Sequence, residues 1–239
     1  MFLHYTEGGF LVILPGDDPC RIVDAILGTG YTEEFCISLN FNPKFIARLM
    51  KAGFLVMSAK LSDPEDSTSK ENGHFILLPR LHLTRSVLFF DKLHIKNSIK
   101  RHLNRFELRF DTDFDYIVDH CIEIHGDDWL TPPLAAALRN IRQNKLHGVY
   151  PASFALYRDG KLVAGEFGVI AGRVYTSYSG FYDESNAGTV QLILAARYLE
   201  EHGFAFFDLG MPLQYKTDLG AIDISPQEFV ELFRSSQQI

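Results

Sequence analysis

The most constraining feature of the sequence is a pair of alternating apolar runs joined by an Asp-Gly turn. The runs cover residues 153–157 and 162–169, and the residues between them read Arg-Asp-Gly-Lys. Asp-Gly favours a type I′ turn, because both central residues of that turn need a positive φ, so the two runs predict a β-hairpin. A third run at residues 173–179 follows an Ala-Gly pair and extends the prediction to a three-stranded meander.

A helix and a buried strand are predicted directly after the meander. Val190, Leu194 and Tyr198 recur at helical spacing, and Gly203 stands where a C-cap is expected. Residues 204–208 then form a short apolar run that ends on the carboxylate Asp208. Three strands, a helix and a buried strand follow one another in the core of a GCN5-related N-acyltransferase. The predicted fold class is therefore α/β (α+β), with an acyltransferase-like domain over residues 85–239 and a small mixed N-terminal domain over residues 1–84.

The N-terminal part carries two helix-start signals and one polar segment. Asp18 and Asn42 each precede a proline, which is the pattern of an N-cap followed by proline at the first helical position. Residues 60–74 are polar and rich in turn-forming residues, and they predict a surface loop or linker, or alternatively a lid.

Composition excludes several classes of protein. The 239 residues are 46% hydrophobic and 22% charged, as in ordinary globular proteins, and no apolar run approaches the length of a membrane span. The N-terminus lacks the basic and apolar regions of a secretion signal, and the three cysteines are too scattered for a disulfide framework or a zinc site. We expect a reduced, cytoplasmic protein without a metal or a membrane partner.

Basic residues cluster in one segment although the net charge is −7. Residues 85–109 contain seven basic and two acidic residues, which is the electrostatic pattern of a phosphate-binding element. A solvated helix face is the alternative interpretation. From Asn97 onward the spacing is helical, with one apolar face formed by Ile95, Ile99, Leu103 and Phe106.

Ordered short motifs resemble the leucyl/phenylalanyl-tRNA–protein transferase family, which moves an amino acid from charged tRNA onto the N-terminus of a protein. Upstream, residues 85–88 and 93–95 resemble the family's Arg-Ala-Val-Leu and Leu-His-Ile segments. The downstream matches are Trp129, Ser153, residues 165–169, Gly172-Arg173, Ser179, Phe181, Asn186-Ala187, Gly203-Phe204, Asp208 and residues 219–221. The resemblance covers roughly residues 85–235 and implies a donor that is charged tRNA, with no cofactor.

The resemblance also implies where protons are handled. The family places an Asp-x-Gln pair at the end of the core strand, and Asp208 matches its Asp. Gly210 occupies the Gln position, and Gln214, four residues further on, is a candidate substitute. Taken without the resemblance, Asp208 could equally accept hydrogen bonds in a turn or helix cap.

An aminoacyl pocket and a tRNA-binding surface are implied in the same way. The pocket residues would be Trp129, Ser153, Tyr178, Ser179, Gly180 and Phe181. Tyr178 and Gly180 stand where the family has Glu and Met, so we expect an opened pocket with an added hydroxyl group and an altered amino-acid preference. Trp129 could alternatively anchor the core. The tRNA-binding residues would be Arg85, Lys92, His94, Lys96, Lys100, Arg101 and Arg105.

The expected function is therefore aminoacyl transfer from aminoacyl-tRNA to the N-terminal residue of acceptor proteins, with a role in N-degron tagging and protein turnover. Residues 183–189 lack the glycine-rich loop that would hold the pyrophosphate of coenzyme A, and they contain two carboxylates. Two alternatives stay open: an N-acyltransferase that uses another acyl donor, and a binding relative that has lost catalysis.

Overall fold

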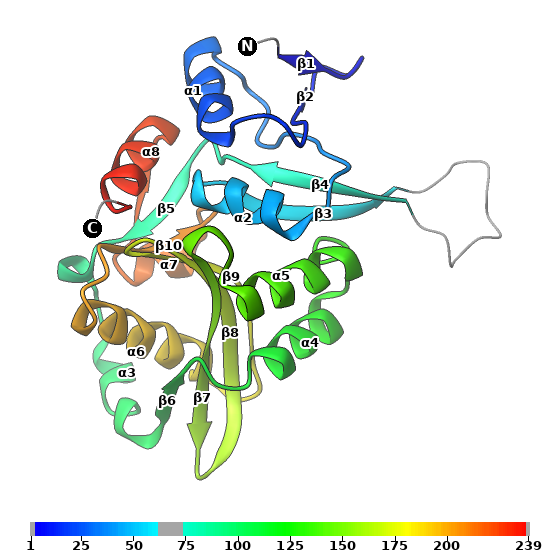
Figure 1. Cartoon of the computed structure of the whole chain (residues 1–239). Coiled ribbons are helices and arrows are strands. Elements are labelled where there is room, and N and C mark those ends of the chain that lie inside the picture. Colours follow the sequence, from blue (N-terminus) through cyan, green and yellow to red (C-terminus); the bar gives the residue numbers. More distant parts are fainter. Residues whose placement is uncertain (1–2, 62–73, 238–239) are drawn as a thin grey trace.

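A computed structural model describes residues 3–61 and 74–237 (Figure 1). Its central feature is a sheet of seven strands in the order β11-β5-β10-β9-β8-β7-β6. The strands of this sheet are β5 (Arg85–Leu88), β6 (Glu107–Phe110), β7 (Val149–Arg158), β8 (Lys161–Ala171), β9 (Val174–Tyr182), β10 (Phe206–Gly210) and β11 (Ile222–Ile224).

The predicted meander is confirmed. β7 and β8 pair antiparallel and end at Arg158 and Lys161, and both turn residues, Asp159 and Gly160, have positive φ values of 51° and 78°. β9 pairs antiparallel with β8, and β10 then lies parallel to β9 because helix α6 (Ala187–Glu201) carries the chain back across the sheet. The fold class is therefore α/β with one large mixed sheet.

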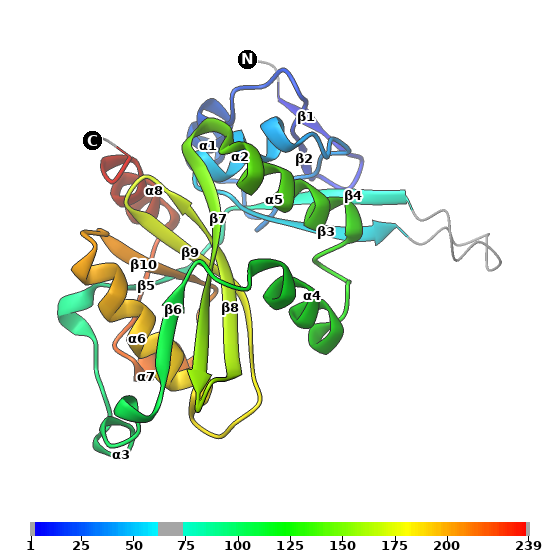
Figure 2. The same cartoon turned by 60° about the horizontal axis from the view of Figure 1, so that its bottom comes forward.

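Helices cover both faces of this sheet (Figures 1 and 2). One face carries α6, whose Ala195, Ala196 and Leu199 pack with Tyr175 and Phe207 of the strands. The other face carries the remaining longer helices and the N-terminal part of the chain. These helices are α2 (Pro43–Lys51), α4 (Phe114–His125), α5 (Pro132–Asn144) and α8 (Pro226–Ser235), whereas α1 (Pro19–Thr29) lies within the N-terminal part, beside β1 and β2 (Figure 1).

The N-terminal part consists of two small sheets and two helices. β1 (His4–Tyr5) pairs with β2 (Leu11–Val12), and β3 (Leu55–Leu61) pairs with β4 (His74–Arg80). Both predicted caps are confirmed, since Asp18 accepts a hydrogen bond from the N–H of Cys20 and Asn42 accepts one from Lys44. Most of the predicted loop over residues 60–74 lies outside the described residues.

The predicted boundary at residue 84 stays a prediction. Strand β5 begins directly after it and enters the large sheet. However, a single cluster of buried side chains contains Ile22, Leu49 and Val56 from the N-terminal part together with Phe167 and Phe206 from the large sheet.

The basic segment is less helical than its spacing suggests. It contains one turn of α-helix, α3 (Asn97–Lys100), and two 3₁₀ turns, η1 (Phe90–Lys92) and η2 (Leu103–Arg105). Two further short elements complete the described chain, η3 (Leu146–Gly148) and α7 (Gln214–Asp218). None of the helices in residues 3–61 and 74–237 combines the length and the apolar character that a bilayer span requires.

Candidate functional site

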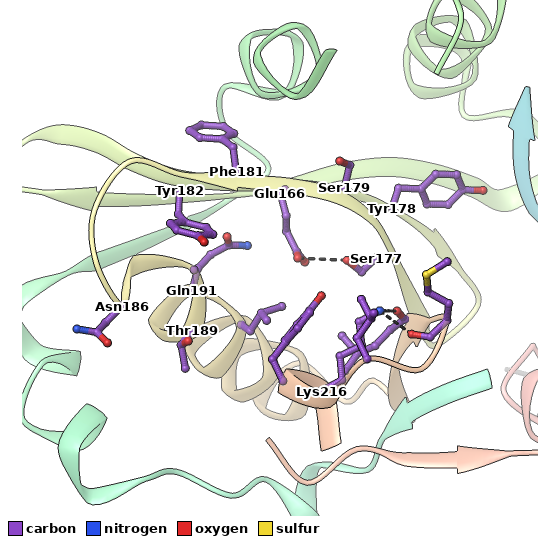
Figure 3. A pocket seen from close by; sticks show the side chains of 17 residues that line it. Glu166, Ser177, Tyr178, Ser179, Phe181, Tyr182, Asn186, Thr189, Gln191 and Lys216 are labelled. Atoms are coloured by element: carbon purple, nitrogen blue, oxygen red, sulfur yellow. Dashed lines mark hydrogen bonds between the residues drawn. The ribbon is translucent and has the colours of Figure 1, made fainter. Parts of the chain in front are cut away.

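A cavity opens where the two parallel strands β9 and β10 diverge. They pair only from Phe206 to Asp208, after which β9 continues along β8 and β10 turns away at Gly210. The cavity has a volume of about 610 Å³ and is bordered by residues 177–182 of β9, the first turns of α6 and residues 209–216 (Figure 3). Ligands bind at the carboxyl ends of parallel strands in many α/β folds, because the separating strands leave a crevice there.

Glu166 projects from β8 into this cavity (Figure 3). Its side chain is 3% exposed, and one carboxylate oxygen accepts a long hydrogen bond of 3.3 Å from the Ser177 hydroxyl. The other oxygen, Oε1, is buried without a hydrogen bond of normal geometry, as are Nε2 of Gln191 on α6 and the hydroxyl of Tyr175 on β9. Both of these neighbours lie close enough to oppose the effect of burial on the pKa of Glu166. Burial raises the pKa of Glu166 to about 7, because the ionised form loses its hydration there.

Lys216 on α7 faces the cavity from the opposite wall. Its ammonium group donates hydrogen bonds to the carbonyl oxygens of Leu209 and, at 2.8 Å, Met211. Burial lowers the pKa of Lys216 to about 8, although nearby carboxylates oppose this effect. The cavity therefore holds one acid and one base whose charged forms both exist near neutral pH.

Asp208, the predicted proton-handling residue, lies on the other face of the sheet. It is 0% exposed, and its carboxylate accepts hydrogen bonds from Arg85 at 2.6 and 2.7 Å, from Thr176 at 2.8 Å and from the N–H of Gly210 at 3.0 Å. All of these donors belong to the protein, so the carboxylate offers no free oxygen to a substrate in this conformation. Its catalytic role stays a prediction and would require the ion pair with Arg85 to open.

Neither candidate for the family's Gln position enters the cavity. Gly210 has a φ of 74°, a conformation that side chains with a Cβ rarely adopt, and this explains the glycine. Gln214 is exposed at the start of α7 and donates a hydrogen bond to Asp218 at 3.0 Å. In this conformation the structure does not bring Gln214 to Asp208 or to Glu166.

The other predicted pocket residues divide between strand and core. Ser179 and Phe181 border the cavity through β9, but their side chains lie on the side away from Glu166, where Phe181 packs edge-on against His120 of α4 (Figure 3). Trp129 stacks on Phe167 with ring centroids 6.3 Å apart, which fits the alternative of a core anchor. Ser153 is buried on β7 and donates to a backbone carbonyl oxygen at 2.7 Å.

Two expectations about the family departures need correction. The Tyr178 hydroxyl does not add a polar group to the cavity, because it accepts a hydrogen bond from the N–H of Val56 at 3.0 Å on the opposite face. Gly180 does not open space either, since a Cβ there would come within 2.9 Å of the Cβ of Glu166. The stem of Glu166 fills the position that a side chain at residue 180 would use.

The basic segment is only partly available for nucleic acid. A groove of about 660 Å³ is lined by His94, Lys96 and Lys100 together with Arg197 of α6. Arg85 was predicted to bind tRNA, but it is 1% exposed and paired with Asp208, so it offers no surface to tRNA in this conformation and the assignment stays a prediction. The remaining predicted residues, Lys92, Arg101 and Arg105, are exposed outside the groove lining.

Sequence reasoning missed Glu166, Gln191, Arg197 and Lys216. The available signal for Glu166 was a lone carboxylate in the apolar run at residues 162–169. No local signal distinguishes Lys216 from an exposed lysine. Across the described residues, no group of three or more potential metal-binding side chains is found.

Known proteins resemble this chain over its C-terminal two thirds. A family model described as leucyl/phenylalanyl-tRNA protein transferase matches residues 87–234. A protein of that name from Pseudomonas aeruginosa is 32% identical over 152 residues, which cover 62% of this chain and 66% of the relative. One from Azoarcus sp. is 35% identical over 150 residues, covering 61% and 62% of the two chains. The alignments thus span slightly less than two thirds of these relatives.

Solved structures add a more distant likeness. L-PGS from Bacillus licheniformis aligns with 99% of this chain and 89% of its own, at 12% identity and a TM-score of 0.44. The family match includes β8, β9, α6, β10 and α7, which together enclose the cavity. Because the family model matches well over half of the chain, this protein belongs to the leucyl/phenylalanyl-tRNA–protein transferase family.

Proposed function

We propose that this protein transfers an amino acid from aminoacyl-tRNA to the N-terminal amine of an acceptor protein. The observation that carries the proposal is that the family match at residues 87–234 contains the whole border of the cavity. Modification of N-termini as a signal for protein turnover is the biological use that such a transfer implies.

The arrangement of the groove and the cavity supports a tRNA donor. Helix α6 contributes Gln191 to the cavity and Arg197 to the basic groove. Six residues of helix separate these positions by about 9 Å along the axis, a distance that the single-stranded 3′ end of a tRNA can span. Phosphates held by Lys96, Lys100 and Arg197 would thus place the terminal ester near the cavity.

The reaction needs little beyond positioning, because the ester of aminoacyl-tRNA is already activated. The acceptor nitrogen attacks the ester carbon, a C–N bond forms, the C–O bond to the ribose breaks, and the amine proton leaves for the departing ribose oxygen. Lys216 uses two ammonium protons on the carbonyls of Leu209 and Met211. Its remaining proton is the candidate donor to the oxyanion that develops on the ester.

Within this proposal Asp208 and Arg85 are positioning residues. Their ion pair joins β10 to β5, and the same carboxylate holds the N–H of Gly210, where β10 leaves the sheet. The pair would thereby fix the wall that carries Leu209, Met211 and Lys216.

The test is transfer from total charged tRNA, labelled with one amino acid at a time, to a panel of peptides with different N-terminal residues. We expect transfer by the wild type and at least a tenfold loss of kcat in Lys216→Met, in line with loss of one oxyanion donor. Lys161→Met, at the exposed β7–β8 turn, is the matched control. Stabilisation by acetyl-CoA without any aminoacyl transfer would support another acyl donor instead.

A binding measurement tests the nucleic-acid partner separately. Replacing Lys96, Lys100 and Arg197 by Ala should reduce the slope of log affinity against log salt by roughly two to three, about one unit for each lost phosphate contact. Circular dichroism would establish that the variant is folded. An unchanged slope in a folded variant would leave these residues as a solvated surface.

A further inference from the structure

The polar floor of the cavity has the chemistry of a binding site for a cation. Glu166 and Lys216 are the charged residues that border the cavity. Lys216 donates to carbonyl oxygens at the end of β10 and just after it, and none of the ion pairs within 4.0 Å in the described chain includes Glu166. A carboxylate that is 3% exposed and lacks an ionic partner is costly unless something else compensates its charge.

The orphaned atoms of this floor show where a ligand would bind. Oε1 of Glu166, Nε2 of Gln191 and the Tyr175 hydroxyl are all buried without a hydrogen bond of normal geometry, and Glu166 and Gln191 border the cavity from a strand and a helix. Oε2 has only the 3.3 Å contact with Ser177. Most buried polar atoms in folded proteins have a partner, so unpaired atoms at a cavity wall indicate a ligand that supplies one.

The rest of the cavity suits a long side chain with an apolar stem. Leu192, Leu213 and Met211 contribute apolar surface, and Tyr182 and Tyr215 stand at its border with exposed fractions of 68% and 51%. Aliphatic stems pack well against such surfaces while the charged end reaches a polar group.

We infer that this cavity selects a basic aminoacyl group, lysyl or arginyl, by pairing its terminal cation with the Glu166 carboxylate. The inference rests on the proposed function and specifies the donor for the same site. A cation would compensate the buried charge and supply the donor that Oε1 lacks. A leucyl or phenylalanyl side chain would instead cover Glu166 without pairing it, which is the arrangement that polar sites reject most strongly.

The glycine at residue 180 leaves room for the Glu166 side chain. A side chain there would collide with the stem of Glu166, because the built Cβ lies 2.9 Å from the Cβ of Glu166. Residues 166 and 180 are also direct partners across β8 and β9. The carboxylate at residue 166 and the glycine at residue 180 are therefore coupled choices.

The experiment compares lysyl, arginyl, leucyl, phenylalanyl and methionyl tRNA as donors for the wild type, Glu166→Gln and Glu166→Leu. We expect a basic amino acid to be the best donor for the wild type. Glu166→Leu should lower kcat/KM for that donor by about 100-fold and raise it for leucine, and Glu166→Gln should lie between them. Glu107→Gln, an exposed carboxylate on β6, is the control and should change nothing.

A binding measurement tests the inference independently of catalytic turnover. Aminonucleoside amides carrying lysine or leucine, which mimic the 3′ end of charged tRNA, are titrated by calorimetry into the same proteins. Preferential binding of the lysine compound by the wild type, lost in Glu166→Leu, would support the inference. If no protein transferred an amino acid although this binding preference was present, the proposed function alone would be rejected. Preference for leucine or phenylalanine, or a preference that Glu166→Leu leaves unchanged, would overturn the inference and make Glu166 part of a structural network.

Discussion

Two polar centres lie on opposite faces of the same sheet and differ in how well they are satisfied. The Arg85–Asp208 pair is at most 1% exposed, and the carboxylate accepts hydrogen bonds from Arg85, Thr176 and Gly210. Glu166 is as deeply buried as such a pair but has one long hydrogen bond and an unpaired oxygen. Nη1 of Arg85 also lacks a partner, but the Asp208 carboxylate is fully hydrogen-bonded, so we call this pair the satisfied centre and Glu166 the unsatisfied centre. A satisfied carboxylate stabilises the fold, whereas an unsatisfied one beside a cavity is prepared for a ligand.

The largest expected effect comes from breaking the satisfied centre. Arg85→Met leaves the Asp208 carboxylate buried without its counter-ion, so the free energy of unfolding should fall by about 3–5 kcal/mol. Urea unfolding measures this free energy. The control is Arg109→Met, which removes an exposed ion pair with Glu107 and should change stability little. Adding Asp208→Leu should recover part of the loss. If Arg85→Met and Arg109→Met were equally stable, the buried ion pair would contribute no more to stability than the exposed one.

Removing the charge of Glu166, at the unsatisfied centre, should stabilise the protein instead of destabilising it. The pKa of Glu166 is about 7 in the folded protein and 4.5 as the ordinary value, so the unfolded chain releases this proton first as pH rises. Stability is therefore lost between these two values, and Glu166→Gln should be about 2–3 kcal/mol more stable than the wild type at pH 8.

The same pair of proteins at pH 4 provides the control, because the wild-type carboxyl is then protonated in both states and the difference should largely vanish. The lowered pKa of Lys216, about 8, acts above this range and is common to both proteins. A gain in stability that does not depend on pH would contradict the assignment to the buried charge.

Gly210 offers a smaller effect at the satisfied centre. Its φ of 74° is unfavourable for any residue with a Cβ, so Gly210→Ala should destabilise the protein by about 1–2 kcal/mol. Gly210→Gln should carry the same strain and should not increase the rate of transfer above that of the wild type, although it recreates the family's residue. Gly28→Ala inside α1, where a Cβ meets nothing within 4 Å, should instead be neutral or slightly stabilising. A stable and more active Gly210→Gln would return Asp208 to the catalytic role.

The finest comparison uses two neighbouring residues whose side chains face different centres. Thr176 donates to Asp208 at 2.8 Å, and Ser177 donates to Glu166 at 3.3 Å. Thr176→Val should therefore cost about 1.5 kcal/mol, as for a hydrogen bond to a charged group, and Ser177→Ala less than about 0.5 kcal/mol. Thermal unfolding of the two variants side by side measures the difference, and a reversed order would argue that Glu166 is the better-paired carboxylate.

Local signals in the sequence determined the elements that surround these centres. The Asp-Gly turn at residues 159–160 predicted the β7–β8 hairpin, and Asp18 and Asn42 predicted the starts of α1 and α2. Each of these features depends on contacts within a few residues, which is why the sequence reveals them. The family motifs likewise located the segments that enclose the cavity.

Only the tertiary structure decided which side chains meet. Arg85 reads as one more cation in a basic segment, yet its partner Asp208 lies 123 residues further along the chain. The pairing of β8 with β9 shifts register between Phe167 and Gly168, opposite Tyr178, so simple alternation does not assign Tyr178 and Ser179 to their faces. Glu166 and Lys216 become a site only because β9 and β10 separate after three paired residues. Burial and pairing arise from contacts between distant segments, and these contacts determine both the charge and the accessibility of each group.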